Sequence, residues 1–98
     1  MSKSFMVELE LPDHFSEEFM SLIPNHRMVV QSMLAKGMLK SYALSMDRSR
    51  IWAVFVADSE FGVLDMVARM PLGPYLTPSV SELMFFNSPD MILHFSMN

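Results

Sequence analysis

The stretch IWAVFVAD, residues 51–58, is the part of this 98-residue chain that decides its fold. Its first seven residues are all apolar, so both alternating faces of an extended strand at this point would be apolar. A strand with one solvated face alternates apolar and polar residues, whereas a strand covered on both faces does not. The stretch therefore predicts a central strand that is covered on both sides.

A β-hairpin is predicted immediately before this strand. LKSYALSM (39–46) is a second strand candidate, and DRSR (47–50) between the two is a four-residue turn candidate. If no bulge intervenes, Ser45 pairs with Trp52. The hairpin places the central strand beside a neighbour in an antiparallel sheet.

Two further strands complete the predicted sheet. SFMVELEL (4–11) alternates strictly between apolar and other side chains, which indicates a strand buried on one face. SVSELMFF (79–86) is the fourth strand. The remaining residues, 87–98, are predicted to form a C-terminal strand or an arm.

The first predicted helix begins after Ser16, a plausible N-cap, and ends at Gly37. Its apolar stripe consists of Phe15, Phe19, Leu22, His26, Val29 or Val30, and Met33. Pro24 lies inside this pattern and removes a backbone donor, so a kink or a short break is expected near 20–24.

The second predicted helix is capped by Asp58 or Ser59 and stops at Pro71. Its buried stripe is expected to contain Phe61, Leu64, and Val67 or Ala68. The order of elements is then β-α-β-β-α-β. This order predicts an α+β protein of the ferredoxin-like class, a single domain over residues 1–98 with an antiparallel sheet and both helices on one face.

Two helices cover only one face of such a sheet. Because the strand at 51–58 is apolar on both faces, its second face must meet another surface, most simply the same face of a second copy. The hydrophobic content of 51% agrees with this expectation. We therefore expect a homodimer that forms through the sheet as an α/β barrel with a small internal cavity. Such dimers could assemble further into a ring.

Composition excludes several classes of function. A net charge of −4 with seven Lys and Arg argues against nucleic-acid binding, and no run is long and apolar enough to span a membrane. Without cysteine, and with three scattered histidines, no metal site is expected, and three glycines provide no cofactor-binding loop. The N-terminus lacks the features of a signal or transit peptide, so a cytoplasmic location is expected.

The segment PLGPY (71–75) carries a resemblance to a known family. Together with the strand and helix before it and the strand after it, from Ile51 to Leu83, it resembles the muconolactone isomerase family. The resemblance implies small ferredoxin-like chains that associate through their sheets. It also implies cofactor-independent isomerisation of an unsaturated lactone by proton transfer. In the family this loop lies at the rim of the sheet near the pocket, which makes Tyr75 a candidate ligand-binding residue.

The same resemblance assigns a catalytic position. Counted back from Gly37, the family's candidate general base, a glutamate, corresponds to His26. An imidazole with a pKa near 6.5 can itself transfer a proton. The alignment makes Lys40 the nearest candidate for holding a substrate carboxylate. A lone histidine on an apolar helix stripe is alternatively a core residue whose hydrogen bonds are satisfied.

Further candidates come from the strand patterns. Glu8 and Glu10 lie on the face of their strand opposite the buried one. If that face lines the barrel, both are candidate ligand-binding residues, and one of them is a buried carboxylate that could act as a general base. If the strand is at an edge of the sheet, both are solvated charges. Tyr42 and Trp52 on the hairpin either line a ligand pocket or pack in the core.

Two functions remain open at this stage. The first is a cofactor-independent isomerase that acts by proton transfer on a small, mostly apolar carbonyl or lactone compound, with His26 as base or acid. The second is a non-catalytic module of the same fold that binds a small apolar molecule or forms an oligomer. The twelve methionines fit either function, since Met fills cores and also lines adaptable binding surfaces.

Overall fold

The structure, a computed structural model, describes residues 2–89. Its elements are β1 (Lys3–Glu10), α1 (Glu17–Ala35), β2 (Leu39–Leu44), β3 (Arg50–Ala57), α2 (Glu60–Arg69), a short 3-10 helix η1 (Gly73–Tyr75) and β4 (Thr77–Leu83). The predicted C-terminal strand or arm lies mostly outside the described residues.

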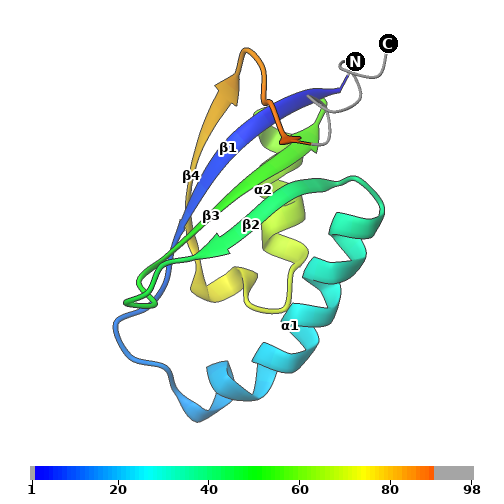
Figure 1. Ribbon diagram of the computed structural model, residues 1–98. Helices are drawn as coiled ribbons and strands as arrows, with labels where there is room; N and C mark the ends of the chain where they lie inside the picture. Colours follow the sequence, from blue (N-terminus) through cyan, green and yellow to red (C-terminus); the bar gives the residue numbers. More distant parts are fainter. Residues whose placement is uncertain (1, 90–98) are drawn as a thin grey trace.

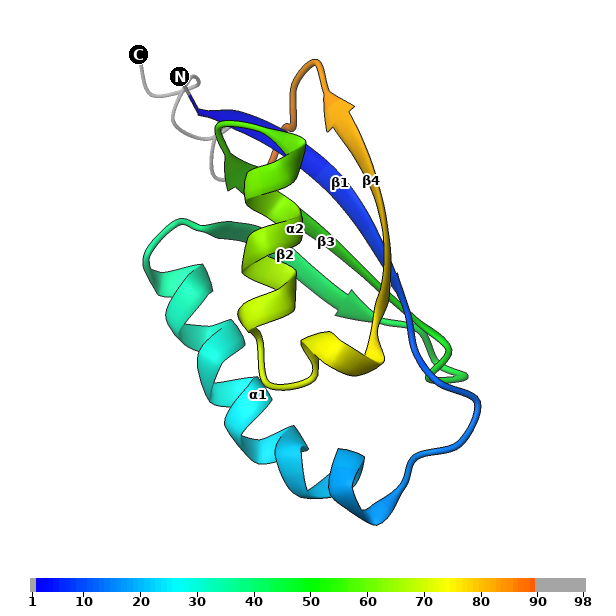
Figure 2. The same cartoon turned by 180° about the vertical axis from the view of Figure 1, so that it is seen from behind.

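The four strands form one antiparallel sheet in the order β2-β3-β1-β4. Both helices lie on the same side of this sheet, which Figure 1 shows from the side without helices and Figure 2 from the side with them. This arrangement confirms the predicted ferredoxin-like α+β fold. We call the sheet face beneath the helices the helix side and the other the open face.

The core lies between the sheet and the helices. Phe5, Val7 and Leu9 of β1 point to the helix side, and their antiparallel partners in β3 are Phe55, Ala53 and Ile51. From the helices, the buried side chains are Phe19, His26, Val30 and Met33 of α1 and Val63 and Val67 of α2. The alternation of 4–11 follows from this layer, and so do Ile51, Ala53 and Phe55 of the apolar run. The other residues of that run, Trp52, Val54 and Val56, point to the open face.

The first helix runs from Glu17 to Ala35 without the break that Pro24 predicted. Its N-cap is Ser16, whose side chain accepts a hydrogen bond from the backbone N–H of Phe19 at 3.1 Å. Pro24 is exposed, and so is Met20, whose carbonyl loses its helical partner. Water can hydrogen-bond to that carbonyl, which explains why the helix continues.

The second helix is rotated relative to the prediction. Val67 is buried as predicted, and Val63 is buried as well, whereas Phe61 is 79% exposed and Leu64 is 39% exposed. Apolar residues occur nearly all round this helix, so its sequence offers two stripes at helical spacing. The stripe with the smaller, β-branched side chains faces the sheet.

The hairpin also differs from its prediction. Ala43, not Ser45, is opposite Trp52, and β2 contains an irregularity between Leu39 and Ser41. The strands close instead at Ser45, whose backbone N–H donates to the carbonyl of Arg50 at 2.9 Å. The hydroxyl of Ser45 accepts from two backbone N–H groups beyond the turn, which favours this earlier closure.

The carboxylate of Asp47 stabilises the same turn. Its Oδ1 accepts hydrogen bonds from the hydroxyls of Ser45 and Ser49, each at 2.7 Å, and from the backbone N–H of Ser49. The hydrogen bonds from Ser49 and Ser45 lower the pKa of Asp47 to about 2.

The last strand ends earlier than predicted, at Leu83 instead of residue 86. Its partner is β1, and the final pair in their register is Ser4 with Leu83. Because β1 begins at Lys3, residues beyond 83 have almost no strand left to pair with. The apolar residues Met84 and Phe85 are left exposed.

Candidate functional site

His26 lies inside the helix layer, where α1 approaches both β2 and the loop after α2. Its Nδ1 accepts the backbone N–H of Leu72 at 3.3 Å, and its Nε2 lies 2.8 Å from the hydroxyl oxygen of Tyr42. Since Nδ1 is an acceptor, the neutral ring carries its hydrogen on Nε2 and donates it to Tyr42. Both ring nitrogens are therefore engaged within the protein.

Burial keeps this pair uncharged. His26 is 3% exposed, and burial lowers its pKa below the ordinary value of 6.5. Burial likewise raises the pKa of Tyr42 to about 12. At neutral pH the contact is thus a hydrogen bond between two neutral groups that ties α1 to β2.

A second polar group lies on the open face. Oε1 of Glu8 accepts the indole N–H of Trp52 at 3.1 Å, and Oε2 of Glu8 forms an ion pair with Nη1 of Arg50 at 2.8 Å. Trp52 remains 41% exposed. The carboxylate therefore orients a large aromatic ring and a guanidinium on a surface that the helices do not cover.

A hollow of about 530 Å³ lies over this group. It is lined by Met6, Glu8, Trp52, Ser79 and Ser81. Two serine hydroxyls and one carboxylate face an otherwise apolar wall, which is the composition of a site for a small, mostly apolar molecule with a few polar atoms.

The sheet separates the two polar groups. Tyr42 pairs with Ala53 and Ala43 pairs with Trp52, so the Tyr42 and Trp52 rings project from opposite faces of the hairpin. The structure thus brings together His26 with Tyr42, and Glu8 with Trp52, as two sites. His26 does not line the hollow over Glu8 and Trp52.

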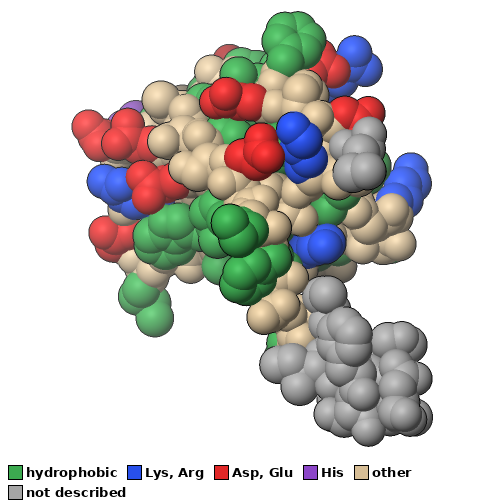
Figure 3. All heavy atoms as spheres, turned by 90° about the horizontal axis from the view of Figure 1, so that it is seen from above, with side chains coloured by type: hydrophobic (Ala, Val, Ile, Leu, Met, Phe, Trp, Pro, Cys, Tyr) green, Lys and Arg blue, Asp and Glu red, His purple; other side chains and the backbone are tan. Residues whose placement is uncertain are grey.

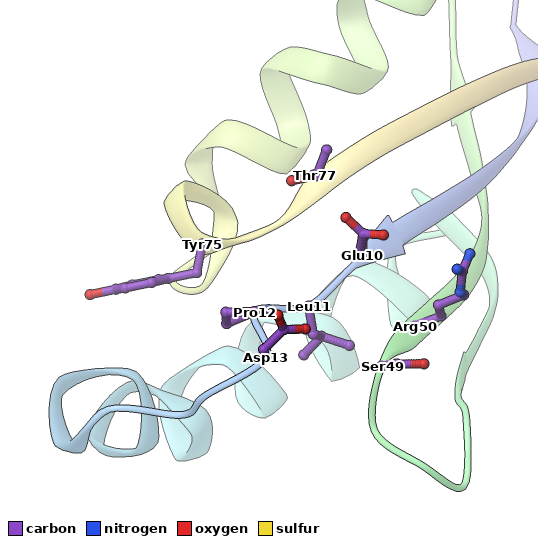
Figure 4. A pocket seen from close by; sticks show the side chains of 8 residues that line it. All are labelled: Glu10, Leu11, Pro12, Asp13, Ser49, Arg50, Tyr75 and Thr77. Atoms are coloured by element: carbon purple, nitrogen blue, oxygen red, sulfur yellow. The ribbon is translucent and has the colours of Figure 1, made fainter.

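Tyr75 and Glu10 lie at one end of the molecule. They line a polar hollow of about 580 Å³ with Leu11, Pro12, Asp13, Ser49, Arg50 and Thr77 (Figure 4). The hydroxyl of Tyr75 points away from Glu10 in this view and donates to the carboxylate of Glu18, which raises the pKa of Tyr75. Its ring packs edge-on against Phe19 of α1, with the ring centroids 5.4 Å apart. Both the ring and the hydroxyl of Tyr75 therefore hold the loop after α2 against α1.

Lys40 lies apart from these groups. It is exposed on β2, at the irregularity where the pairing with β3 shifts. No hydrogen bond or ion pair places it near the His26 or the Glu8 group. Its predicted role in holding a carboxylate stays a prediction.

Sequence reasoning missed three side chains of the open-face site. Arg50 is the last residue of the predicted turn DRSR (47–50), yet it belongs to β3 and pairs with Glu8. Ser79 and Ser81 alternate on β4, and their register against Glu8 and Met6 shows that they share the open face. The alternation of Ser79 and Ser81 could be seen in the sequence, but their position opposite Glu8 and Met6 depends on the register between β4 and β1, which the sequence did not give.

Within residues 2–89, no group of His, Asp and Glu side chains is arranged to hold a metal ion. Neither helix in the described part of the chain is long and apolar enough to cross a membrane. The cytoplasmic location stays a prediction.

These features define a small α+β protein of the ferredoxin-like class, with a sheet face that neither helix covers and that carries a hydrogen-bonded carboxylate. The chain has the fold of muconolactone isomerase. Its structure matches a crystal structure of that enzyme at 3.3 Å resolution with a TM-score of 0.68 and 22% sequence identity, over 87% of this chain and 92% of the enzyme chain. No protein-family model matches the sequence, and no curated protein matches it significantly. At this identity the likeness establishes the fold alone.

Proposed function

We propose that this protein is a homodimer that binds a small, mostly apolar molecule between two open faces. The observation that carries this proposal is the open face itself, where Trp52 and Met6 are 41% and 37% exposed around a carboxylate that is already hydrogen-bonded. Two such faces packed together would form the α/β barrel expected from the sequence. Association of dimers into a ring stays a prediction.

Exposed apolar side chains continue beyond the sheet, which supports assembly. Met84 is 96% exposed and Phe85 is 68% exposed at the end of β4. Hydrophobic side chains also gather on the surface seen from above in Figure 3. Exposed apolar groups of this kind mark interaction surfaces on small proteins.

The geometry of His26 favours binding without catalysis. A general base needs a free lone pair within reach of a substrate proton. In His26 the lone pair of Nδ1 accepts from Leu72, and Nε2 carries a hydrogen. The residue thus behaves as a core histidine whose hydrogen bonds are satisfied.

A second candidate is cofactor-independent isomerisation of a lactone or carbonyl compound by proton transfer. The fold of muconolactone isomerase and the 2.8 Å contact between His26 and Tyr42 support it. In that case His26 would act as base or acid, and ligand entry would have to displace Leu72 from Nδ1. Tyr75, Lys40 and Glu10 would then be candidates for contacts at the ends of the pocket.

Replacing Met6 with Asp is expected to dissociate the dimer. Met6 lies between Val54 of β3 and Ser81 of β4 on the open face, so a carboxylate there would be buried unpaired on dimerisation, at a cost of about 3–5 kcal/mol. Sedimentation at micromolar concentration should give about twice 11.2 kDa for the wild type and 11.2 kDa for the variant.

Trp52 is the single tryptophan of the chain, so its fluorescence reports on the open face directly. Its emission should shift to longer wavelength in Met6→Asp. The matched control is Met28→Asp on α1, where the side chain is 71% exposed on the helix layer. A wild type that sediments as a monomer with water-exposed Trp52 contradicts the proposed dimer.

A panel of unsaturated lactones separates the two candidate functions. Under the binding proposal, lactones that fit should quench or shift Trp52 emission, and none should be isomerised faster than in buffer. Under the second candidate, isomerisation should fall at least about a hundredfold in His26→Gln, since general acid–base catalysis contributes that much. Turnover that is equal in wild type and His26→Gln contradicts the role of His26 as base or acid.

A further inference from the structure

A separate hollow of about 260 Å³ lies between the two helices, away from the open face. Its lining comes from α1, the loop that follows α1, and α2, which lie side by side on the helix side of the sheet (Figure 2). The lining residues are Val29, Ser32, Met33, Lys36, Met38, Met66, Arg69 and Met70. This hollow remains open to solvent even when two open faces are packed together.

Its wall is apolar and adaptable. Four of the eight lining residues are methionines, whose unbranched and polarizable side chains adjust to ligands of different shape. Met33 and Met70 are buried and form the floor, whereas Met38 is 37% exposed at the margin. An apolar chain laid in this hollow would therefore replace water against thioether and methylene groups.

Two cations line the hollow, one at the C-terminal end of each helix. Lys36 follows the last turn of α1, and Arg69 is the last residue of α2. Arg69 uses its Nε to contact Oδ2 of Asp65 at 3.1 Å, which leaves its terminal nitrogens for a second anion. Within the described part of the chain, no carboxylate forms an ion pair with Lys36. The chain has only seven Lys and Arg and a net charge of −4, so two cations at one small apolar hollow form a local exception.

We propose that this hollow binds an alkyl monocarboxylate, with the chain against the methionines and the carboxylate between Lys36 and Arg69. Charge complementarity selects an anion, and the apolar floor selects an alkyl body. The volume lies just below the range of about 300–1,000 Å³ for drug-sized ligands, which fits one short alkyl chain better than a helix of a partner protein. The site is distinct from the open face and does not depend on the proposed dimer.

Calorimetric titration of the full chain with octanoate tests this site. We expect saturable binding of one octanoate per chain and about tenfold weaker binding to Lys36→Gln/Arg69→Gln, as the loss of two exposed charge contacts implies. 1-Octanol, which lacks the charge, should bind both proteins equally. The matched control, Arg27→Gln/Arg48→Gln, removes the same charge from exposed positions outside the hollow and should bind octanoate like wild type.

A second variant blocks the hollow without altering charge. Ser32 is an exposed residue of α1 at the hollow, and Ser32→Phe should abolish octanoate binding while far-UV circular dichroism stays unchanged. Absence of saturable binding to the wild type overturns the proposal, as does equal affinity in wild type and Lys36→Gln/Arg69→Gln. A shift of Trp52 emission by octanoate that is lost in Met6→Asp also overturns it, because octanoate would then occupy the open face.

Discussion

Gly73→Ala should destabilise the protein by about 2–4 kcal/mol and lower its melting temperature by about 10–25 °C. A Cβ at this position would lie 2.0 Å from the carbonyl oxygen of Val67 and 3.1 Å from the carbonyl carbon and oxygen of Ala68. These are backbone atoms of α2, which cannot move as a side-chain end can. The loop would have to separate from the helix to admit a single methyl group.

The close approach is held by hydrogen bonds on both sides of the glycine. The N–H of Gly73 donates to the carbonyl of Met70 at 2.8 Å, and its carbonyl accepts from Leu76 at 3.1 Å. Leu72 and Leu76 on either side are buried. Displacing Gly73 therefore disturbs the packing of the whole turn between α2 and β4.

Gly62→Ala is the matched control for this prediction. The added Cβ would have its nearest neighbours at 3.5 Å and 3.6 Å, which is ordinary van der Waals contact, and alanine favours the helix by up to about 1 kcal/mol. Thermal and urea denaturation should show this variant at or slightly above wild-type stability. If the free energies of unfolding of the two alanine variants agree within about 0.5 kcal/mol, the close contact of Gly73 with α2 is contradicted.

His26→Ala should cost about 2–4 kcal/mol of folding free energy, measured by urea denaturation at pH 8. The substitution leaves a cavity in the core and removes the partners of the Leu72 N–H and the Tyr42 hydroxyl. Tyr42→Phe removes only the hydroxyl that accepts the hydrogen bond from Nε2 of His26, and this variant should cost about 1–2 kcal/mol. A loss below about 0.5 kcal/mol in His26→Ala would contradict the buried, doubly hydrogen-bonded position.

Titration of His26 should also make the free energy of unfolding depend on pH. Because burial lowers the pKa of His26 in the folded state, the unfolded chain binds its proton first as pH falls through 6.5. The contribution of His26 to stability is therefore complete above about pH 6.5 and declines below it until the lowered folded-state pKa is passed. This decline should be absent in His26→Gln and retained in His14→Gln, where the histidine is exposed. A wild type and a His26→Gln variant with the same pH profile would exclude this assignment.

Local patterns predicted most of the elements for identifiable reasons. The alternation of Phe5, Val7 and Leu9 reflects burial of one face of β1 against the helices. The apolar run at 51–57 predicted a strand of the sheet correctly, whereas the covering of its second face stays a prediction. Ser16 capped the first helix as predicted, because its hydroxyl meets a backbone N–H three residues later. Such signals depend on residues within one or two turns of each other.

The candidate site was predictable only in part. Glu8, Trp52, His26 and Tyr42 were each selected from the sequence as candidates. The single pocket in which His26, Tyr42 and Trp52 act together does not occur within this chain, since the sheet lies between the two rings of the hairpin. Arg50 was overlooked because its importance arises from Glu8, 42 residues away in the sequence.

The amino-acid order alone established the strands, the helices, their ferredoxin-like succession and the surplus of apolar surface on the central strand. Three features were settled only by the folded chain: which stripe of α2 is buried, where the hairpin closes, and why residue 73 must be glycine. The spacing of apolar residues along the chain reflects only the local helix or strand geometry. The three exceptions depend on groups brought together from distant positions, or on a choice between two equally apolar helix faces that only docking against the sheet resolves.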